Sequence, residues 1–332
     1  MVYDPTIYFG VLALLGLMGM LAAWQFRKRF PILASICTPR FLGIGLSDWS
    51  LGYYTLITVL GLFLLWWPEY LGAQAFFLLL LTTGAFFLFS LYFAFVQAVT
   101  REPGAAWSIC GAVLNLLVLI AVYLSVPVAD LADFLLTAEA SLVVILGFAI
   151  AIGVGGAALT NILFFKFLSD FIISKEEYEV LKVIAQVTAV ALVAVLMFGL
   201  ALLYTPAAEP MVAESILLGL LGIALINVLA EVCLNFWIGP AIVKISFDEP
   251  HFTLSEDLNA ARRLAFALGA VSMVSWFAMM VLITLRDLDL NIQPVMTAYA
   301  VFVILAVVIS QLIDRSLVNE NSDEQDIIQH PE

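Results

Sequence analysis

Charged residues are scarce in this chain: Asp, Glu, Lys and Arg together make up 12% of its 332 residues. A soluble domain carries about 25% charged residues and about 45–50% apolar ones. Here the hydrophobic residues reach 64%, and the mean hydropathy is +1.10. The composition therefore excludes an ordinary water-soluble protein and indicates a protein that is embedded in a membrane.

Basic residues are the scarcer of the two charged classes. The chain has 13 Lys and Arg against 26 Asp and Glu, which gives a formal net charge of −13 at pH 7. Proteins that bind nucleic acid present a basic patch to the phosphate backbone. We therefore expect no nucleic-acid partner.

Cysteine and histidine are also few. The three cysteines are Cys37, Cys110 and Cys233, and the two histidines, His251 and His330, lie in polar segments. There is no CxxC pair and no Cys/His cluster with the spacing of a metal site. These absences exclude a bis-histidine haem or a histidine-ligated metal within the bilayer. We predict no metal site, and the sequence leaves the cofactor unknown.

Long apolar runs are abundant, and a helix that crosses a bilayer needs about 20 mainly apolar residues. Such segments must be helical, because lipid offers no partner for unpaired backbone groups. The predicted spans are 6–26, 50–67, 74–98, 106–127, 136–165, 178–204, 213–243, 260–285 and 293–313. The predicted fold is an all-α, polytopic membrane helix bundle of about nine transmembrane helices.

Two further segments do not fit a span. Residues 31–49 are moderately apolar but contain Pro31, Pro39, Gly43 and Gly45, a pattern that favours a re-entrant or interfacial half-helix. Residues 316–332 are polar and acidic without apolar periodicity, which predicts a disordered tail.

The basic residues predict the orientation. If the N-terminus lies outside, twelve of the 13 Lys and Arg fall in inner segments, and only Arg286 lies in an outer loop. The positive-inside rule assigns the basic side to the cytoplasm. We expect a protein of the plasma (inner) membrane, with the N-terminus outside and the C-terminus cytoplasmic.

Ionisable residues within a span are candidates for function. Glu231 lies near the middle of the predicted span 213–243, and Asn227 and Asn235 each lie four residues from it, on the same helix face. One hypothesis is that this face binds or relays a proton or a cation. The alternative is structural: Glu231 is neutral or hydrogen-bonded, and the asparagines connect helices.

Weaker polar signals occur in other spans. Asn161 follows the glycine-rich stretch 153–156, where neighbouring helices can approach closely. Helix packing is the simpler explanation of Asn161, and a substrate path is the alternative for which we include it in the candidate intramembrane polar site. Ser272, Ser275, Asn115 and Gln311 are expected to connect helices by hydrogen bonds.

Three stretches of the first four spans resemble the vitamin K epoxide reductase family. They are CTPRFLGIGLSDWSLGYY at 37–54, LYFAFVQ at 91–97 and AAWSIC at 105–110. The resemblance implies a four-helix scaffold with a quinone-like or lipid pocket. The family's redox CxxC aligns with Ala105 and Ser108, which cannot form a disulfide, and only Cys37 and Cys110 remain as residual redox candidates. The resemblance thus implies a scaffold that has lost its catalytic cysteines.

The second half of the chain resembles uncharacterised bacterial multi-helix membrane proteins. Four stretches carry this likeness: GVGGAALTN at 153–161, FFKFLSD at 164–170, ISKEE at 173–177 and GAVSMVSW at 269–276. We therefore expect a four-helix vitamin K epoxide reductase-like module at 1–130, a five-helix membrane module at 131–315 and the disordered acidic tail at 316–332.

Several functions remain open at this point. The first is a catalytically degenerate redox scaffold that binds membrane lipid, a quinone-like ligand or a protein partner, with the acidic tail and the loop 247–258 as surfaces for that partner. The second is a proton/cation-coupled transporter that uses Glu231. The third is a residual quinone-linked thiol oxidoreductase, and the last is a subunit of a larger assembly. The absence of a complete catalytic motif argues against an enzyme.

Overall fold

The structure is a computed structural model, and it describes residues 5–29, 40–41, 44–67, 72–99, 105–125, 128–169, 175–205, 210–234, 238, 256–286 and 291–329. Within these residues the chain divides into two compact units, Met1–Ala138 and Glu139–Glu332. The predicted boundary after residue 130 and the observed division both fall in the first turns of α5 (Val128–Ser169).

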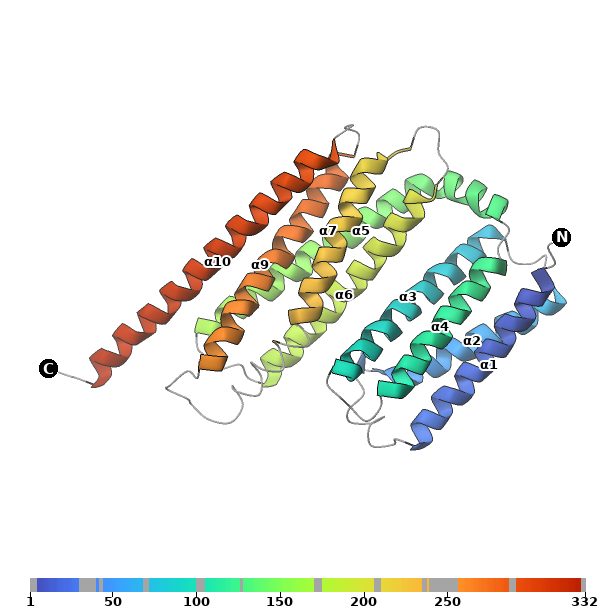
Figure 1. Cartoon of the computed structure of the whole chain (residues 1–332), viewed down its shortest axis with the longest axis horizontal. Helices are drawn as coiled ribbons and strands as arrows, with labels where there is room; N and C mark the ends of the chain where they lie inside the picture. Colours follow the sequence, from blue (N-terminus) through green and yellow to red (C-terminus); the bar gives the residue numbers. More distant parts are fainter. Residues whose placement is uncertain are drawn as a thin grey trace. The chain divides into compact units, whose positions relative to one another are not determined.

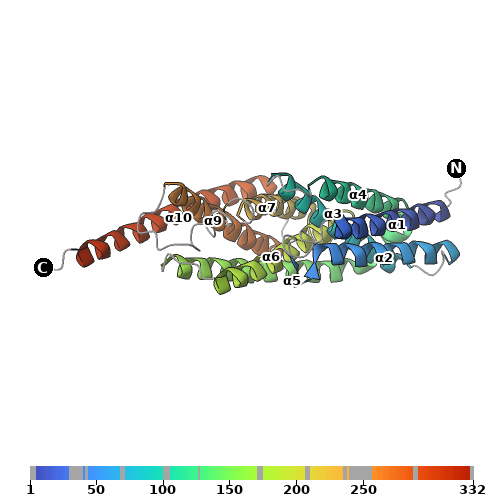
Figure 2. The ribbon, with the colours of Figure 1, turned by 90° about the horizontal axis from the view of Figure 1, so that it is seen from below.

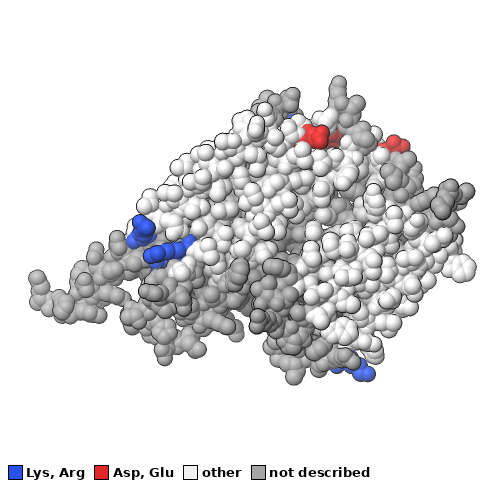
Figure 3. Space-filling view, viewed as in Figure 1, with Lys and Arg blue, Asp and Glu red and all other residues white. Residues whose placement is uncertain are grey.

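Nine helices of the described residues are long and apolar enough to cross a membrane, so the chain is a polytopic integral membrane protein. The predicted fold class is confirmed. The distribution of charge agrees with a membrane protein. On the face shown in Figure 3, the described charged side chains lie toward the helix ends, and a broad band between them carries none. Such a band is what a hydrocarbon layer requires.

The first unit contains α1 (Pro5–Arg29), α2 (Leu46–Trp66), α3 (Ala73–Val99) and α4 (Ala105–Ser125) (Figure 1). Two strands of two residues each, β1 (Arg40–Phe41) and β2 (Ile44–Gly45), form an antiparallel pair just before α2. This pair lies within the predicted half-helix at 31–49, where Gly45 disfavours a helix, and residues 46–49 already belong to α2. Residues 30–39, with Cys37, lie outside the described residues.

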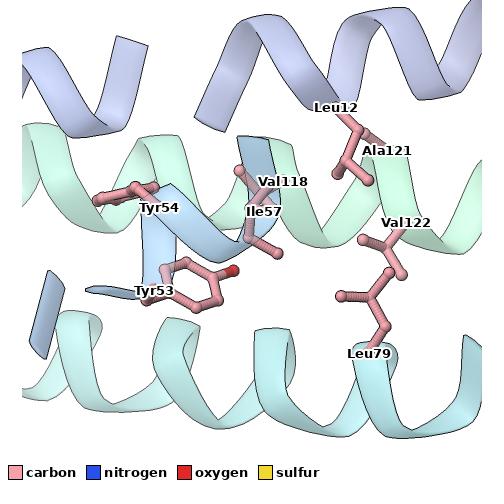
Figure 4. Packing of buried hydrophobic residues seen from close by; sticks show 8 residues of the cluster. All are labelled: Leu12, Tyr53, Tyr54, Ile57, Leu79, Val118, Ala121 and Val122. Atoms are coloured by element: carbon pink, nitrogen blue, oxygen red, sulfur yellow. The ribbon is translucent and has the colours of Figure 1, made fainter. Parts of the chain in front are cut away.

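The core of the first unit is apolar and aromatic. Leu12, Tyr53, Tyr54, Ile57, Leu79, Val118, Ala121 and Val122 form one buried cluster, to which all four helices contribute (Figure 4). The Tyr53 ring stacks on Phe86 with 4.0 Å between ring centroids. Buried aromatic area of this kind holds the four helices in one arrangement.

Helices α1 and α2 pack at very short range. A Cβ atom added at Gly61 would lie 2.6 Å from the backbone nitrogen of Ala13, and one added at Gly16 would lie 2.7 Å from that of Thr58. Gly19 leaves room for the Tyr54 ring in the same way. Small residues let helix backbones approach within a membrane, where van der Waals packing drives association.

The second unit contains most of α5, together with α6 (Lys175–Leu203), α7 (Glu214–Cys233), α9 (Glu256–Thr284) and α10 (Ile292–Gln329). In Figure 2, α7, α9 and α10 form one layer beside the α5–α6 pair. The N-terminus of α10 is capped by Asn291, whose Oδ1 accepts a hydrogen bond of 3.1 Å from the Gln293 backbone N–H.

One prediction for this unit is wrong, and another falls partly outside the described residues. Helix α7 is described to Cys233, and the end of the predicted span 213–243 lies at residues that the structure does not describe. At the other end, α10 runs to Gln329 and so includes residues 316–329, where the sequence predicts disorder. Extending an existing helix adds one hydrogen bond for each residue fixed, without a new nucleation step.

Candidate functional site

The polar side chains inside the second unit meet around α9. This helix makes side-chain hydrogen bonds to three neighbours: Ser272 to Glu231 of α7, Met273 to Asn161 of α5, and Ser275 to Tyr299 of α10. The expectation that Ser272 and Ser275 connect helices is confirmed.

Glu231 and Ser272 form the centre of the candidate site. The Ser272 hydroxyl donates to Glu231 Oε1 at 2.8 Å, and Ser272 itself is 3% exposed. Glu231 is partly buried on α7 and has further interactions. A hydroxyl donor stabilises a carboxylate in a low-dielectric region more strongly than it would in water. The structure thus places the predicted acid against another helix rather than against open lipid.

Asn227 lies one turn from Glu231 on α7, which places it about 6 Å along the helix axis. Its side chain is fully buried, and neither Nδ2 nor Oδ1 has a hydrogen-bond partner among the described residues. A buried amide left unpaired costs on the order of 1–3 kcal/mol for each group. This is the least satisfied polar side chain of the second unit.

The register of α7 against α9 shows what lies level with Asn227. Glu231 contacts Ser272, and a Cβ at Gly219 would lie 3.6 Å from Leu282 Cδ1, so the two helices run antiparallel. Asn227 lies four residues before Glu231 on α7, and Trp276 lies four residues after Ser272 on α9. Because the helices are antiparallel, Asn227 and Trp276 lie at the same level along the pair. Ile223 and Met279, which lie about one turn further along, are both fully buried.

Trp276 is the largest fully buried side chain, and its Nε1–H has no partner among the described residues. The six-membered edge of its indole, Cε3, Cζ3 and Cη2, lies against Gly153 of α5, where no larger residue would fit. The Nε1–H is on the opposite edge of the ring and therefore faces away from Gly153. Glycine at 153 thus makes room for the indole that carries this unpaired donor.

Asn161 lies on α5 next to the same part of α9. Its Nδ2 donates to Ala157 O at 2.8 Å and lies 3.7 Å from Met273 Sδ, and its Oδ1 would be 3.1 Å from a Cβ at Gly269. These contacts connect α5 with α9, as helix packing requires. Asn235, the third residue of the predicted face, lies outside the described residues.

The first unit has its own unpaired polar atoms. The Tyr53 hydroxyl on α2 and Asn115 Oδ1 on α4 are buried, and neither has a hydrogen-bond partner among the described residues. Ala105 is the first residue of α4, and Ser108 lies one turn later. Cys110 is a free, exposed thiol on this helix, and Cys233 of α7 is free and partly buried, whereas Cys37 is not among the described residues. Within the same described ranges there is no group of three or more His, Cys, Asp or Glu that could hold a metal ion.

Two residues of this site do not follow from the search for ionisable groups. Tyr299 shares a hydrogen bond of 2.8 Å with Ser275, and Trp276 carries the unpaired N–H. In the sequence both look like ordinary aromatic residues of apolar spans. Glu139 of α5 is buried, and its Oε1 accepts a hydrogen bond of 2.6 Å from the Met211 backbone N–H.

Comparison with known proteins provides no relative. No family model matches the chain, no curated protein matches it, and no solved structure matches its fold.

Proposed function

We propose that the second unit carries a proton or a small cation on Glu231 and couples its movement to transport across the membrane. The observation that carries this proposal is the Glu231–Ser272 hydrogen bond in the interior of the unit, one turn from the unpaired amide of Asn227. An acidic residue at the centre of a span costs on the order of 2.5–3.5 kcal/mol on insertion scales. Residues retained at that cost commonly belong to ion pathways and proton relays.

The neighbourhood of Glu231 supports exchange of an ion better than a purely structural role. A structural acid is expected among neighbours whose hydrogen bonds are complete, since partly satisfied polar networks are worse than an apolar core. Here the adjacent Asn227 has no partner for either amide atom. The Glu231 carboxylate and the Ser272 hydroxyl also supply oxygen ligands, which hard cations prefer.

The test is to follow the protonation of Glu231 directly. Infrared difference spectra of the full chain in lipid nanodiscs should show a carboxyl band that titrates with pH and disappears in Glu231→Gln. The matched control is Glu214→Gln, because Glu214 is an exposed acid on the same helix. The proposal fails if the titrating carboxyl band and the binding of ²²Na⁺ are the same in wild type and Glu231→Gln.

For the first unit we propose a second role, a catalytically degenerate vitamin K epoxide reductase-like scaffold that binds lipid or a quinone-like ligand. Two observations support it. Ala105 and Ser108 occupy the two positions that align with the family's redox cysteines, and the buried Tyr53 hydroxyl and Asn115 Oδ1 have no hydrogen-bond partner among the described residues. Menadione is a suitable probe, and Tyr53→Phe together with Asn115→Leu should abolish its binding. Alkylation of Cys37 and Cys110 under oxidising conditions tests whether a residual thiol oxidoreductase activity is possible. That activity requires both thiols to become resistant to alkylation, and free alkylation of both would exclude it.

For orientation we propose an inner-membrane protein with its N-terminus outside and its C-terminus cytoplasmic. Its support is the distribution of Lys and Arg, of which Arg286 alone falls in an outer loop. Reporter fusions after residues 204 and 263 test it. The first should report the outside and the second the cytoplasm, and the reverse result would invert the orientation. A protein partner would then meet the acidic tail and the loop 247–258 in the cytoplasm.

A further inference from the structure

Four buried polar atoms of the second unit have no hydrogen-bond partner among the described residues. Ser215 Oγ lies near the start of α7, and the other three are Asn227 Nδ2, Asn227 Oδ1 and Trp276 Nε1. The Asn227 and Trp276 side chains are 0% exposed. The register fixed by the Glu231–Ser272 contact places them level with each other on adjacent helices. The Asn227 amide and the Trp276 N–H both lack a partner and lie at the same level of α7 and α9. A single bound molecule at this level could therefore bond to both.

The chemistry of these atoms restricts that partner. The amide NH₂ and the indole N–H can only donate, and the amide oxygen can only accept. A bare cation could pair with Oδ1 alone and would leave both N–H groups unpaired. An anion could accept from the N–H groups, but it would leave Oδ1 unpaired and would lie about one helical turn from the Glu231 carboxyl group. A neutral group that both accepts and donates, such as a hydroxyl or a carboxamide, completes all three.

We propose that Asn227 and Trp276 form the substrate subsite of the second unit, and that this subsite takes a small uncharged molecule with a hydroxyl or carboxamide group. The proposal rests on the proposed coupling function, in which Glu231 carries the ion one turn away from the subsite. Gly153 holds the indole in position by accommodating its six-membered edge, so that the N–H edge is left for the substrate. Buried Ile223 and Met279 border the layer about one turn further along the two helices.

The test measures binding of neutral and charged probes to the full chain in lipid nanodiscs. Glycerol and acetamide should raise the Tm saturably, as ligands of the native state do. Tetramethylammonium chloride and sodium acetate, the charged probes of similar size, should have no saturable effect. A response to the cationic or anionic probe alone overturns the proposal, as does the absence of any response to both neutral probes.

Variants then assign the response to this subsite. Asn227→Leu keeps the size of the side chain and should abolish the Tm rise, and Trp276→Phe should weaken the apparent affinity by roughly tenfold. The matched controls are Ser215→Ala, which removes another α7 hydroxyl without a partner among the described residues, and Trp66→Phe, an exposed tryptophan. Both controls should retain the wild-type response. If Asn227→Leu and Trp276→Phe respond like wild type, the assignment is wrong.

A last variant separates this inference from the coupling function. Glu231→Gln should still respond to acetamide but should lose the dependence of that response on pH. A response that keeps its pH dependence in Glu231→Gln contradicts the coupling function and leaves the subsite standing. The subsite is overturned if Asn227→Leu loses stability and the wild-type Tm does not respond to the neutral probes. The layer would then hold structural water only.

Discussion

The two units place polar groups in the membrane in different ways. In the first unit, residues 5–26, 49–66, 73–99 and 105–125 contain no Asp, Glu, Lys or Arg. Several hydroxyls of α2 and α3 donate to their own helix, as Thr58 does to Tyr54 O at 2.7 Å and Thr83 to Leu79 O at 2.6 Å. In the second unit hydroxyls also donate to their own helix, as Ser275 does to Val271 O at 2.7 Å. Side chains of α9 bond in addition to those of α5, α7 and α10, and one of these partners is an acid.

This difference distinguishes helix association by close packing from helix association by polar contacts. Lipid chains are as apolar as leucine, so helices in a membrane associate through close packing or through polar contacts between them. The first unit uses close packing, with glycines against backbone along α1 and α2. The second unit adds polar contacts and leaves some of them incomplete at Asn227 and Trp276. Function is therefore to be sought first in the second unit. Four experiments test the contrast between the units, from the largest expected effect to the smallest.

Gly61→Ala should be the most damaging substitution in the first unit. The new Cβ would lie 2.6 Å from the backbone nitrogen of Ala13, and backbone cannot rotate aside. We expect a loss of about 3 kcal/mol in the free energy of unfolding, because overpacking of this kind forces helices apart. Thermal unfolding in detergent measures it. Gly52→Ala is the control on the same helix, since nothing lies within 4 Å of its Cβ position, and equal losses in both variants would refute the close α1–α2 contact.

Gly153→Ala tests the corresponding glycine contact in the second unit. Its neighbour is the Trp276 ring rather than backbone, and a ring can tilt, so the expected loss is smaller, about 2 kcal/mol. Trp276 should also change its environment, which near-UV circular dichroism reports. Gly155→Ala has open space at its Cβ position and should leave both signals unchanged. If Gly153→Ala changes neither the free energy of unfolding nor the near-UV circular dichroism, the Trp276 indole is not confined against Gly153.

Ser272→Ala and Ser275→Ala compare a hydrogen bond to an acid with one to a neutral hydroxyl. Ser272 donates to Glu231, and Ser275 shares a hydrogen bond with Tyr299. If Glu231 is ionised in the resting protein, Ser272→Ala should cost about 1.5–3 kcal/mol and Ser275→Ala about 1 kcal/mol. Equal costs would indicate a neutral Glu231. A double-mutant cycle of Ser272→Ala with Glu231→Gln measures the interaction free energy between the two side chains.

Removing a tyrosine hydroxyl from each unit should give the smallest effects. Tyr299→Phe breaks the hydrogen bond to Ser275 and should cost about 1 kcal/mol in unfolding free energy. Tyr53→Phe removes a buried hydroxyl that has no partner among the described residues, so it should be neutral or slightly stabilising. A destabilised Tyr53→Phe would show that the Tyr53 hydroxyl has a partner in the native protein, such as a bound ligand.

Particular residues show how far the sequence leads. Glu231 and Asn227 are identified from the sequence because an acid and an amide four residues apart stand out in an apolar span. Trp276 and Tyr299 are not, because an aromatic residue in a span is usually packing. Their polar atoms matter only once burial and partners are known, and these depend on residues far away in the chain, such as Gly153 and Ser275.

The sequence by itself determined that this chain is a polytopic helical membrane protein, because the cost of unpaired backbone in lipid allows long apolar segments no other form. It predicted the number of spans as well, since nine helices among the described residues are long and apolar enough to cross a membrane. The tertiary structure decided which polar groups meet. A span's own pattern gives the face on which a residue lies, but the neighbour of that face is set by the packing of distant helices, here α5, α7 and α10 around α9.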